Sequence, residues 1–292
     1  MKKSKKILFI SPVAPPIKGG SIQILDNLIK SSPEKNITLI TSYTKNCSSY
    51  DSKVKVKIIR SKIMTLWTKN SEVNKSWRII INIIRNHNLI RIPIKIINIL
   101  FISLHIIIEK YDIVIAQQVS SYFNIILYFA KKLIKADIIC WAYGEEINKV
   151  YKKQGYKGKI YKFSIISSFN LANKIIAITK KAKNLLVNIG IDESKIFVVY
   201  PGVDTAIYNP YKDCKYLEER YNLNNCKVLL CVGRIIKRKG QDTGIKVLYE
   251  LIRNRNMKVK LFIVGDGRDL TYLKDLVEKL DLGSNVIFLK NV

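Results

Sequence analysis

The residues best suited to chemistry in this chain form a basic loop at residues 233–240, with the sequence GRIIKRKG. The loop follows an apolar, β-branched run at 228–232, which is typical of a buried parallel strand. Glycine lets a backbone approach a ligand closely, an arginine offers a bidentate fork, and a lysine offers a point charge, and the loop carries four such cations. A helix that begins near Gln241 adds the partial positive charge of its N-terminus. The loop therefore predicts a phosphate-binding site, and the alternative is a basic turn that faces solvent.

The elements that must position this loop alternate along the whole chain. In the first two thirds, strands are expected at 7–10, 37–40, 54–59, 113–116, 138–141, 175–178 and 196–199, and helices at 21–31, 120–134 and 180–189. Alternation of this kind predicts an α/β protein whose parallel sheets are covered by helices on both faces.

A second βα pattern begins after a change in composition at 201–227, where apolar periodicity fades. It consists of strands at 228–232, 259–264 and 286–289 and helices at 241–253 and 270–280. We expect two Rossmann-like, doubly wound domains at 1–205 and 206–292, joined by the 201–227 linker. The second domain is incomplete, and its last strand leaves an apolar edge.

The charge of the chain is strongly positive, with a net value of +29. Residues 1–205 carry 34 Lys and Arg against 12 Asp and Glu, a net of +22, which attracts nucleic acid, phosphorylated substrates or an anionic membrane. No nucleic-acid-binding motif is recognised. The five cysteines have no C-x-x-C spacing and there are only two histidines, so neither a disulfide framework nor a zinc site is expected. Such cysteine usage is typical of a reducing cytosol.

An apolar stretch at 92–108 raises the question of a membrane span. Its uncharged part, 96–108, has 13 residues, which is fewer than the ~20 needed to cross a bilayer. We therefore expect a buried helix there. Upstream, residues 67–91 mix Trp, Arg and Ile in a pattern that suits a helix lying on an anionic membrane surface. An ordinary half-exposed helix is the alternative.

Four segments resemble, in the same order, the retaining glycosyltransferases of family 4, which have the two-domain GT-B architecture. They are the loop after the first strand that ends in Gly19-Gly20, the strand 174–180, the turn 199–204 with the sequence VYPGVD, and the basic loop together with IVGDG at 263–267. The resemblance spans nearly the whole chain.

The resemblance gives the basic loop a specific role. Arg234 and Lys239 match the residues that hold the diphosphate of a nucleotide-sugar donor, where fixed cations stabilise the charge that grows on the leaving group. Gly19 and Gly20 match a loop that faces the donor phosphate, although a simple tight turn would look the same in sequence. Asp204 is expected to fix a turn.

The nucleoside of the donor is expected near Gly265, Lys290 and Asn291, because these positions match the family's nucleoside-contacting segments. Lys290 stands where the family usually has glycine. The sequence Gly265-Asp266-Gly267 is interpreted as a tight turn whose aspartate caps the next helix.

The vicinity of the sugar and acceptor is expected at Tyr143, Glu145, Glu146 and Thr179. Tyr143 replaces the histidine of the family's His-Gly-x-Glu segment, and a phenol with a pKa near 10 is a poor base at neutral pH. The alternative is that Tyr143 simply packs at a strand end.

The resemblance implies transfer of a hexose from a nucleotide diphosphate sugar to a lipid-linked, envelope or capsule acceptor, with no metal or other cofactor. We expect a cytoplasmic protein that is peripheral on the inner face of the cell membrane. The family's donor-binding pair of glutamates, separated by seven residues, is absent from these 292 residues, so no catalytic residue is assigned and a C-terminal truncation is expected. The alternatives are an inactive or split homologue and a basic nucleic-acid-binding protein.

Overall fold

The computed structural model describes residues 4–32, 36–65, 88–119 and 122–290. The chain divides into two compact units, Met1–Val203 and Asp204–Val292. The boundary therefore lies two residues before the expected one.

The first unit is built on a seven-stranded parallel sheet in the order β3-β2-β1-β4-β5-β6-β7. Its strands are β1 (Ile7–Ile10), β2 (Ile37–Ser42), β3 (Lys57–Ser61), β4 (Ile113–Gln117), β5 (Asp137–Ala142), β6 (Lys174–Ala177) and β7 (Ile196–Val198). The strand order reverses between β1 and β4, which makes this junction the topological switch point of a Rossmann-like sheet. The expected α/β, doubly wound class is confirmed.

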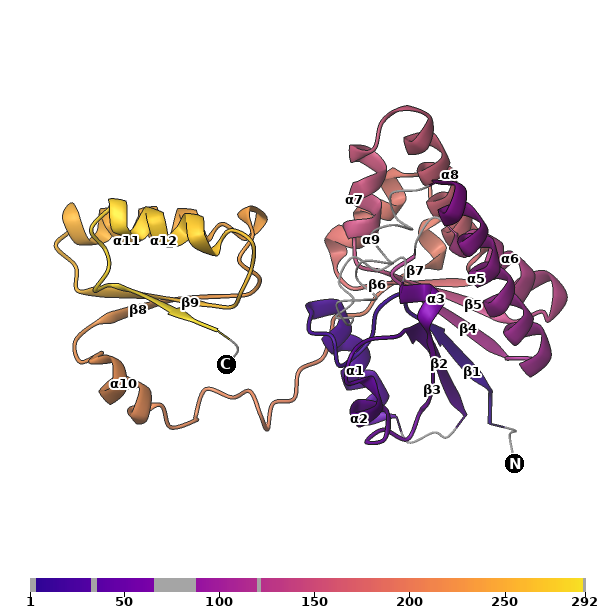
Figure 1. The fold of residues 1–292 in the computed structure, drawn as a ribbon, viewed down its shortest axis with the longest axis horizontal. Coiled ribbons are helices and arrows are strands. Elements are labelled where there is room, and N and C mark those ends of the chain that lie inside the picture. The colour runs from indigo at the N-terminus through magenta and orange to yellow at the C-terminus, as the bar shows by residue number, and fades with distance from the viewer. Residues whose placement is uncertain (1–3, 33–35, 66–87, 120–121, 291–292) are drawn as a thin grey trace. The chain divides into compact units, whose positions relative to one another are not determined.

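Helices cover both faces of this sheet (Figure 1). They are α1 (Gly20–Ser31), α2 (Cys47–Asp51), α3 (Lys62–Thr65), α5 (Asn88–Glu109), α6 (Phe123–Leu133), α7 (Glu145–Lys152), α8 (Gly155–Leu171) and α9 (Lys180–Asn188). α1 and α2 lie on one face, and α5, α6 and α8 lie on the other.

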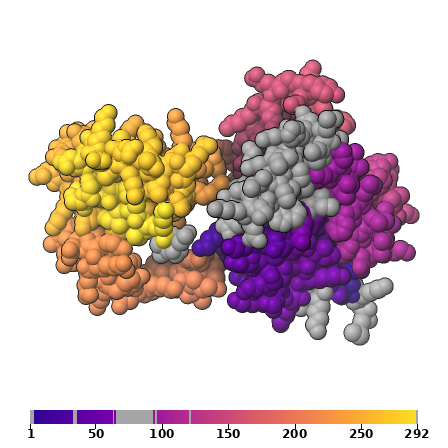
Figure 2. Space-filling view, viewed as in Figure 1, coloured from indigo at the N-terminus to yellow at the C-terminus, as the bar shows by residue number. Residues whose placement is uncertain are grey.

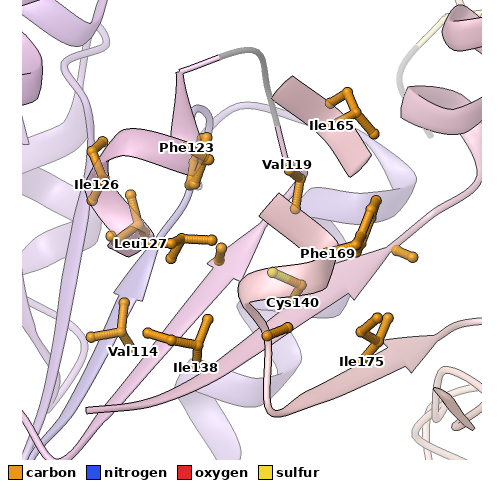
Figure 3. Close-up of a cluster of buried hydrophobic side chains, with 14 of the residues drawn as sticks. Val114, Val119, Phe123, Ile126, Leu127, Ile138, Cys140, Ile165, Phe169 and Ile175 are labelled. Carbon is orange, nitrogen blue, oxygen red and sulfur yellow. The ribbon is translucent and has the colours of Figure 1, made fainter. Parts of the chain in front are cut away.

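The largest hydrophobic core lies under the second of these helical layers. Phe123 and Leu127 of α6 and Phe169 of α8 are fully buried. They face Val114 and Ile138, which point out of neighbouring strands (Figure 3). β-Branched side chains suit the pleated surface of a buried parallel sheet, and this is why near-continuous Ile and Val runs form these strands.

The apolar run in α5 corrects one expectation. The helix is continuous from Asn88 to Glu109, but only one of its faces is buried. Ile102 and Ile106 face the core, whereas Leu100 and Leu104 are each 58% exposed. The expectation of a buried helix was therefore wrong for the face of α5 that carries Leu100 and Leu104. No described helix is long and apolar enough to cross a membrane.

The second unit has a three-stranded parallel sheet in the order β10-β9-β8. Its elements are α10 (Lys215–Tyr221), β8 (Lys227–Val232), α11 (Gln241–Arg253), β9 (Val259–Val264), α12 (Leu270–Lys279) and β10 (Val286–Leu289). α11 and α12 cover one face (Figure 1). The other face of β8 exposes Val228, Leu230 and Val232.

Two local expectations differ from the structure. The linker 201–227 contains the helix α10, which is fixed where Tyr221 packs edge-on against Phe262, with ring centroids 5.0 Å apart. β3 begins at Lys57 rather than at residue 54, because a turn after α2 uses the Lys53 N–H to bond the Tyr50 carbonyl. The stretch 67–91 lies largely outside the described residues, and its expected place on a membrane surface is a prediction that the structure does not reach.

Candidate functional site

The predicted site residues lie in loops at the carboxyl ends of parallel strands, in both units. Ligands of open α/β sheets bind outside these ends, at the point where the strand order reverses. In the first unit this point is the junction of β1 and β4. The predicted site residues therefore form two clusters, one in each unit.

Gly19 and Gly20 lie where the loop after β1 becomes α1. Gly19 occupies the N-cap position with an extended backbone, and no side chain caps the helix. A Cβ atom on Gly20 would meet nothing within 4 Å. No side chain caps the first turn of α1, so its N–H groups can donate to an anion.

A network of amide side chains joins this loop to β4 and to the turn after β5. Gln117, the last residue of β4, donates an Nε2 hydrogen bond to the hydroxyl of Tyr143 and another, 3.4 Å long, to the carbonyl of Ser21. The amide of Gln118 donates to the hydroxyl of Ser21. Sequence reasoning missed both glutamines, although their position directly after a predicted strand was a usable signal.

The hydroxyl of Tyr143 is fixed in place by its hydrogen bond from Gln117. Burial raises the pKa of Tyr143, and the hydrogen bond from Gln117 only partly opposes this. The ring also packs beside Trp141, with centroids 6.2 Å apart. Because its oxygen accepts from Gln117, the hydroxyl proton of Tyr143 is available for donation. The group therefore suits a hydrogen-bond donor and not a base at neutral pH.

The two glutamates of this turn have different roles. Glu146 is buried and accepts a 2.7 Å hydrogen bond from the backbone N–H of Tyr143. Burial raises the pKa of Glu146, while N–H groups of the turn and Lys149 oppose the rise. Glu145 is exposed and lies 3.6 Å from the ammonium of Lys149. Glu146 thus fixes the turn, and Glu145 faces solvent.

Thr179 begins the neighbouring helix. Its hydroxyl caps α9 by accepting a 3.0 Å hydrogen bond from the N–H of Ala182. A Cβ atom on Gly144, which has a φ of 87°, would lie 3.8 Å from the side chain of Ala182. The Tyr143–Glu146 turn and the start of α9 are therefore adjacent, as expected for loops after neighbouring strands.

In the second unit, the basic loop runs from the end of β8 through a 3₁₀ turn, η2 (Lys237–Lys239), into α11. The side chain of Lys239 folds back over Gly233, with Cε 3.8 Å from the position that a Cβ atom on Gly233 would take. Buried Gln241, another residue that sequence reasoning missed, donates a 3.1 Å hydrogen bond to the carbonyl of Arg234. The side chains of Arg234 and Lys239 are exposed beside the first turn of α11.

Two glycines of the loop after β9 lie directly against the basic loop. A Cβ atom on Gly265 would lie 2.1 Å from the carbonyl oxygen of Gly233, and one on Gly267 would lie 2.0 Å from that of Ile235. The N–H of Ile235 donates to the carbonyl of Asp266 over 2.9 Å. The glycines thus permit backbone-to-backbone contact that fixes the shape of the basic loop.

The expected helix-capping role of Asp266 was wrong. Asp269 occupies the N-cap position of α12, and its Oδ2 accepts a 2.6 Å hydrogen bond from the backbone N–H of Lys237. Asp266 bonds the N–H of Gly267 instead and lies 3.6 Å from the ammonium of Lys290. Asp269 therefore joins the basic loop to the start of α12, and Asp266 joins the loop after β9 to the residue after β10. Asp204 does fix a turn, since its Oδ1 accepts from the N–H of Ala206 at 2.9 Å.

The expected nucleoside positions gather at the ends of β9 and β10. The N–H of Gly265 donates a 2.8 Å hydrogen bond to the carbonyl of Leu289, so the loops that carry Gly265 and Lys290 are adjacent. Asn291 lies outside the described residues. Among the residues that the structure covers, no three Asp, Glu, His or Cys side chains come together as a metal site.

Models of known protein families match most of the residues in each unit. A family model described as Glycosyltransferase Family 4 matches residues 55–207, which is more than half of the chain. A second model, described as Glycosyl transferases group 1, matches residues 217–292.

Known proteins resemble the chain in sequence and in fold. The GDP-mannose-dependent alpha-(1-6)-phosphatidylinositol monomannoside mannosyltransferase of Mycolicibacterium smegmatis is 38% identical over 93 residues, which is 32% of this chain and 24% of that protein. The structure of Anabaena HepE in complex with UDP and glucose superposes with a TM-score of 0.66 at 16% identity, over 99% of this chain and 70% of HepE. WaaG, a glycosyltransferase involved in lipopolysaccharide biosynthesis, gives a TM-score of 0.59 at 15% identity, over 98% of this chain and 70% of WaaG. The segment shared with the mannosyltransferase is about a quarter of that relative's length.

Proposed function

This chain belongs to glycosyltransferase family 4, and we propose that it transfers a hexose, with retention, from a nucleotide diphosphate sugar to a hydroxyl acceptor. The observation that carries the proposal is the basic loop. Arg234 and Lys239 are both exposed in the loop that leads into α11, and the backbone of this loop is fixed by Gln241 and by the glycines after β9. Cations on a fixed backbone beside a helix N-terminus suit the binding of a diphosphate.

The chemistry that this arrangement supports is stabilisation of the leaving group. As the bond between sugar and phosphate breaks, negative charge grows on the diphosphate, and cations already in place stabilise it without reorganisation. The proposal assigns this role to Arg234 and Lys239, with no metal or other cofactor. In this proposal the donor phosphate assists deprotonation of the acceptor, and the N–H groups at Gly19 and Gly20 are assigned to phosphate binding.

We assign the sugar and acceptor to the cluster after β5 and β6 of the first unit. Tyr143 is the proposed hydrogen-bond donor, with Glu145 and Thr179 near it. A lipid-linked or envelope glycan acceptor is supported by the name of the M. smegmatis relative, which places its acceptor on phosphatidylinositol. The net charge of +22 in residues 1–205 supports work at the cytoplasmic face of an anionic membrane.

A second candidate function is that of an inactive homologue, or one part of a split enzyme, that binds the donor but does not transfer the sugar. Binding and turnover must therefore be measured separately.

The test is donor turnover by the purified chain. UDP-glucose, UDP-galactose and GDP-mannose are each supplied with a lipid-linked acceptor extract, and release of the nucleoside diphosphate is followed. We expect turnover with one donor and about a 100-fold loss in Lys239→Ala, from removal of one transition-state cation.

Lys237→Ala is the matched control, because this lysine is exposed in the same loop. It should retain turnover within about three-fold, as surface changes usually do. Turnover that Lys239→Ala leaves intact would refute the assignment of the loop. Donor binding without turnover would favour the second candidate. Proton NMR of the product reports whether the anomeric configuration is retained.

A further inference from the structure

The outer face of α5 is apolar along its whole second half. Between residues 96 and 108 the polar side chains are Asn98, Ser103 and His105. Asn98 and Ser103 are buried, and His105 bonds the hydroxyl of Tyr111 over 2.9 Å. The solvent-facing positions are instead apolar. They are Ile96, Ile97, Leu100, Phe101, Leu104 and Ile108, and they recur at helical spacing.

The neighbouring helices extend this apolar surface. α6 packs against both α5 and α8, so the three helices form one layer (Figure 1). In the space-filling view, residues of α5 and α6, purple to magenta, reach the surface of the first unit (Figure 2). α6 exposes Ile125, Tyr128 and Leu133, and α8 exposes Ile160 and Phe163. A groove of about 490 Å³ lies along the contact between α6 and α8 and is lined by Tyr128, Phe129 and Phe163.

The charged side chains of α6 and α8 are all positive. Neither α6 nor α8 contains an aspartate or glutamate. Lys132, Lys159 and Lys162 are exposed, and the last two lie within one turn of Phe163, which is itself 68% exposed. The acidic residue of α5, Glu109, is paired with Lys6. A surface that is both apolar and cationic matches the boundary between headgroups and acyl chains of an anionic bilayer.

We propose that the α5–α6–α8 layer is a docking surface for an anionic lipid bilayer, with α5 lying in the membrane plane. The apolar side chains enter the boundary region and the lysines contact lipid phosphates. A second copy of the chain fits this layer less well, because it would bring the same cations face to face. Exposed apolar patches of this extent on a folded protein mark interaction sites.

The inference deepens the proposed function, since a lipid-linked acceptor would be met at this surface, but lipid binding itself requires no transfer reaction. It also differs from the expectation for residues 67–91, because every side chain that carries it belongs to the described part of α5, α6 or α8.

The experiment is vesicle flotation of the 292-residue chain without donor or acceptor. Vesicles of phosphatidylcholine alone are compared with vesicles containing phosphatidylglycerol, at low and high salt. We expect the chain to float with the anionic vesicles, and high salt to weaken this binding. The double variant Leu100→Asp/Leu104→Asp should bind about 100-fold more weakly, because each leucine contributes about ten-fold or more to partitioning.

The matched control is Val247→Asp/Tyr272→Asp, which adds the same charge at exposed apolar positions on α11 and α12 of the second unit. It should float like the wild type. The proposal is overturned if the wild type does not float, if both double variants lose binding equally, or if Leu100→Asp/Leu104→Asp abolishes a dimer and leaves flotation unchanged. Circular dichroism checks that the variants fold, and retained nucleoside diphosphate binding by Leu100→Asp/Leu104→Asp separates this result from a failure of the proposed function.

Discussion

At the scale of single residues, the basic loop depends on glycines as much as on cations. Gly233 and Gly265 have φ values of 145° and 143°, which side chains other than glycine rarely adopt. Gly267 has an ordinary φ but no room for a side chain. Backbone contacts between two loops therefore fix the backbone positions of Arg234 and Lys239.

Gly267→Ala should destabilise the second unit and weaken nucleotide binding. The added Cβ would lie 2.0 Å from the carbonyl oxygen of Ile235, so the two loops must separate. We expect a loss of about 1–3 kcal/mol in the free energy of unfolding, measured by urea denaturation. Gly283→Ala, where a Cβ meets nothing within 4 Å, is the control and should change stability by less than about 0.5 kcal/mol. Equal effects of the two changes would show that the contact between the loops does not matter.

The sequence predicted where the charges of the site lie, because Gly, Arg and Lys after an apolar run indicate a phosphate loop. It did not predict Gln117, Gln118 or Gln241. An amide side chain has no spacing rule that indicates its partner, and these partners are brought close only by the folded sheet. The same holds for Tyr143, whose hydroxyl is controlled by Gln117 from another strand.

At the scale of elements, strands were easier to predict than helix faces. The run at 259–264 and the run at 286–289 form β9 and β10 with unchanged bounds. The burial of α5 was mispredicted, because apolar side chains occupy nearly every position and periodicity then does not distinguish the inner face from the outer one. Helical patterns were predicted between most of the strands, but the pattern of α8 is weak, since Gly158, Ser164 and Ser168 lie on its buried side.

The stability of α5 should depend on pH through His105. Burial lowers the pKa of His105. Glu109 opposes this decrease, and Lys57 and Lys6 add to it. Because the unfolded chain then binds a proton more readily than the folded one, stability is present above a pH of about 6.5 and is lost as the pH falls below it. When the pH is lowered from 7.5 to 5.5, the free energy of unfolding measured by urea denaturation should fall less in His105→Gln than in the wild type. An equal or larger loss in His105→Gln would contradict this account.

At the scale of the whole molecule, the order of elements predicted two Rossmann-like sheets, and the structure confirms this class. Strand alternation and turn residues are local signals, so they survive in a single sequence. The expectation that the run 228–232 forms a buried strand was wrong for Val228, Leu230 and Val232, which are exposed on β8, because burial depends on which elements pack against a face. For the same reason, the exposed apolar surface of α5, α6 and α8 was not predicted.

The central claim is that the basic loop binds the diphosphate of a sugar nucleotide. Calorimetric titration of UDP and GDP into the wild type, Lys239→Ala and Lys237→Ala tests it without requiring turnover. We predict binding of at least one nucleotide by the wild type, an affinity at least about ten-fold lower in Lys239→Ala, and a change of less than about three-fold in Lys237→Ala. No binding of either nucleotide by the wild type, or equal losses in the two lysine variants, would contradict the account.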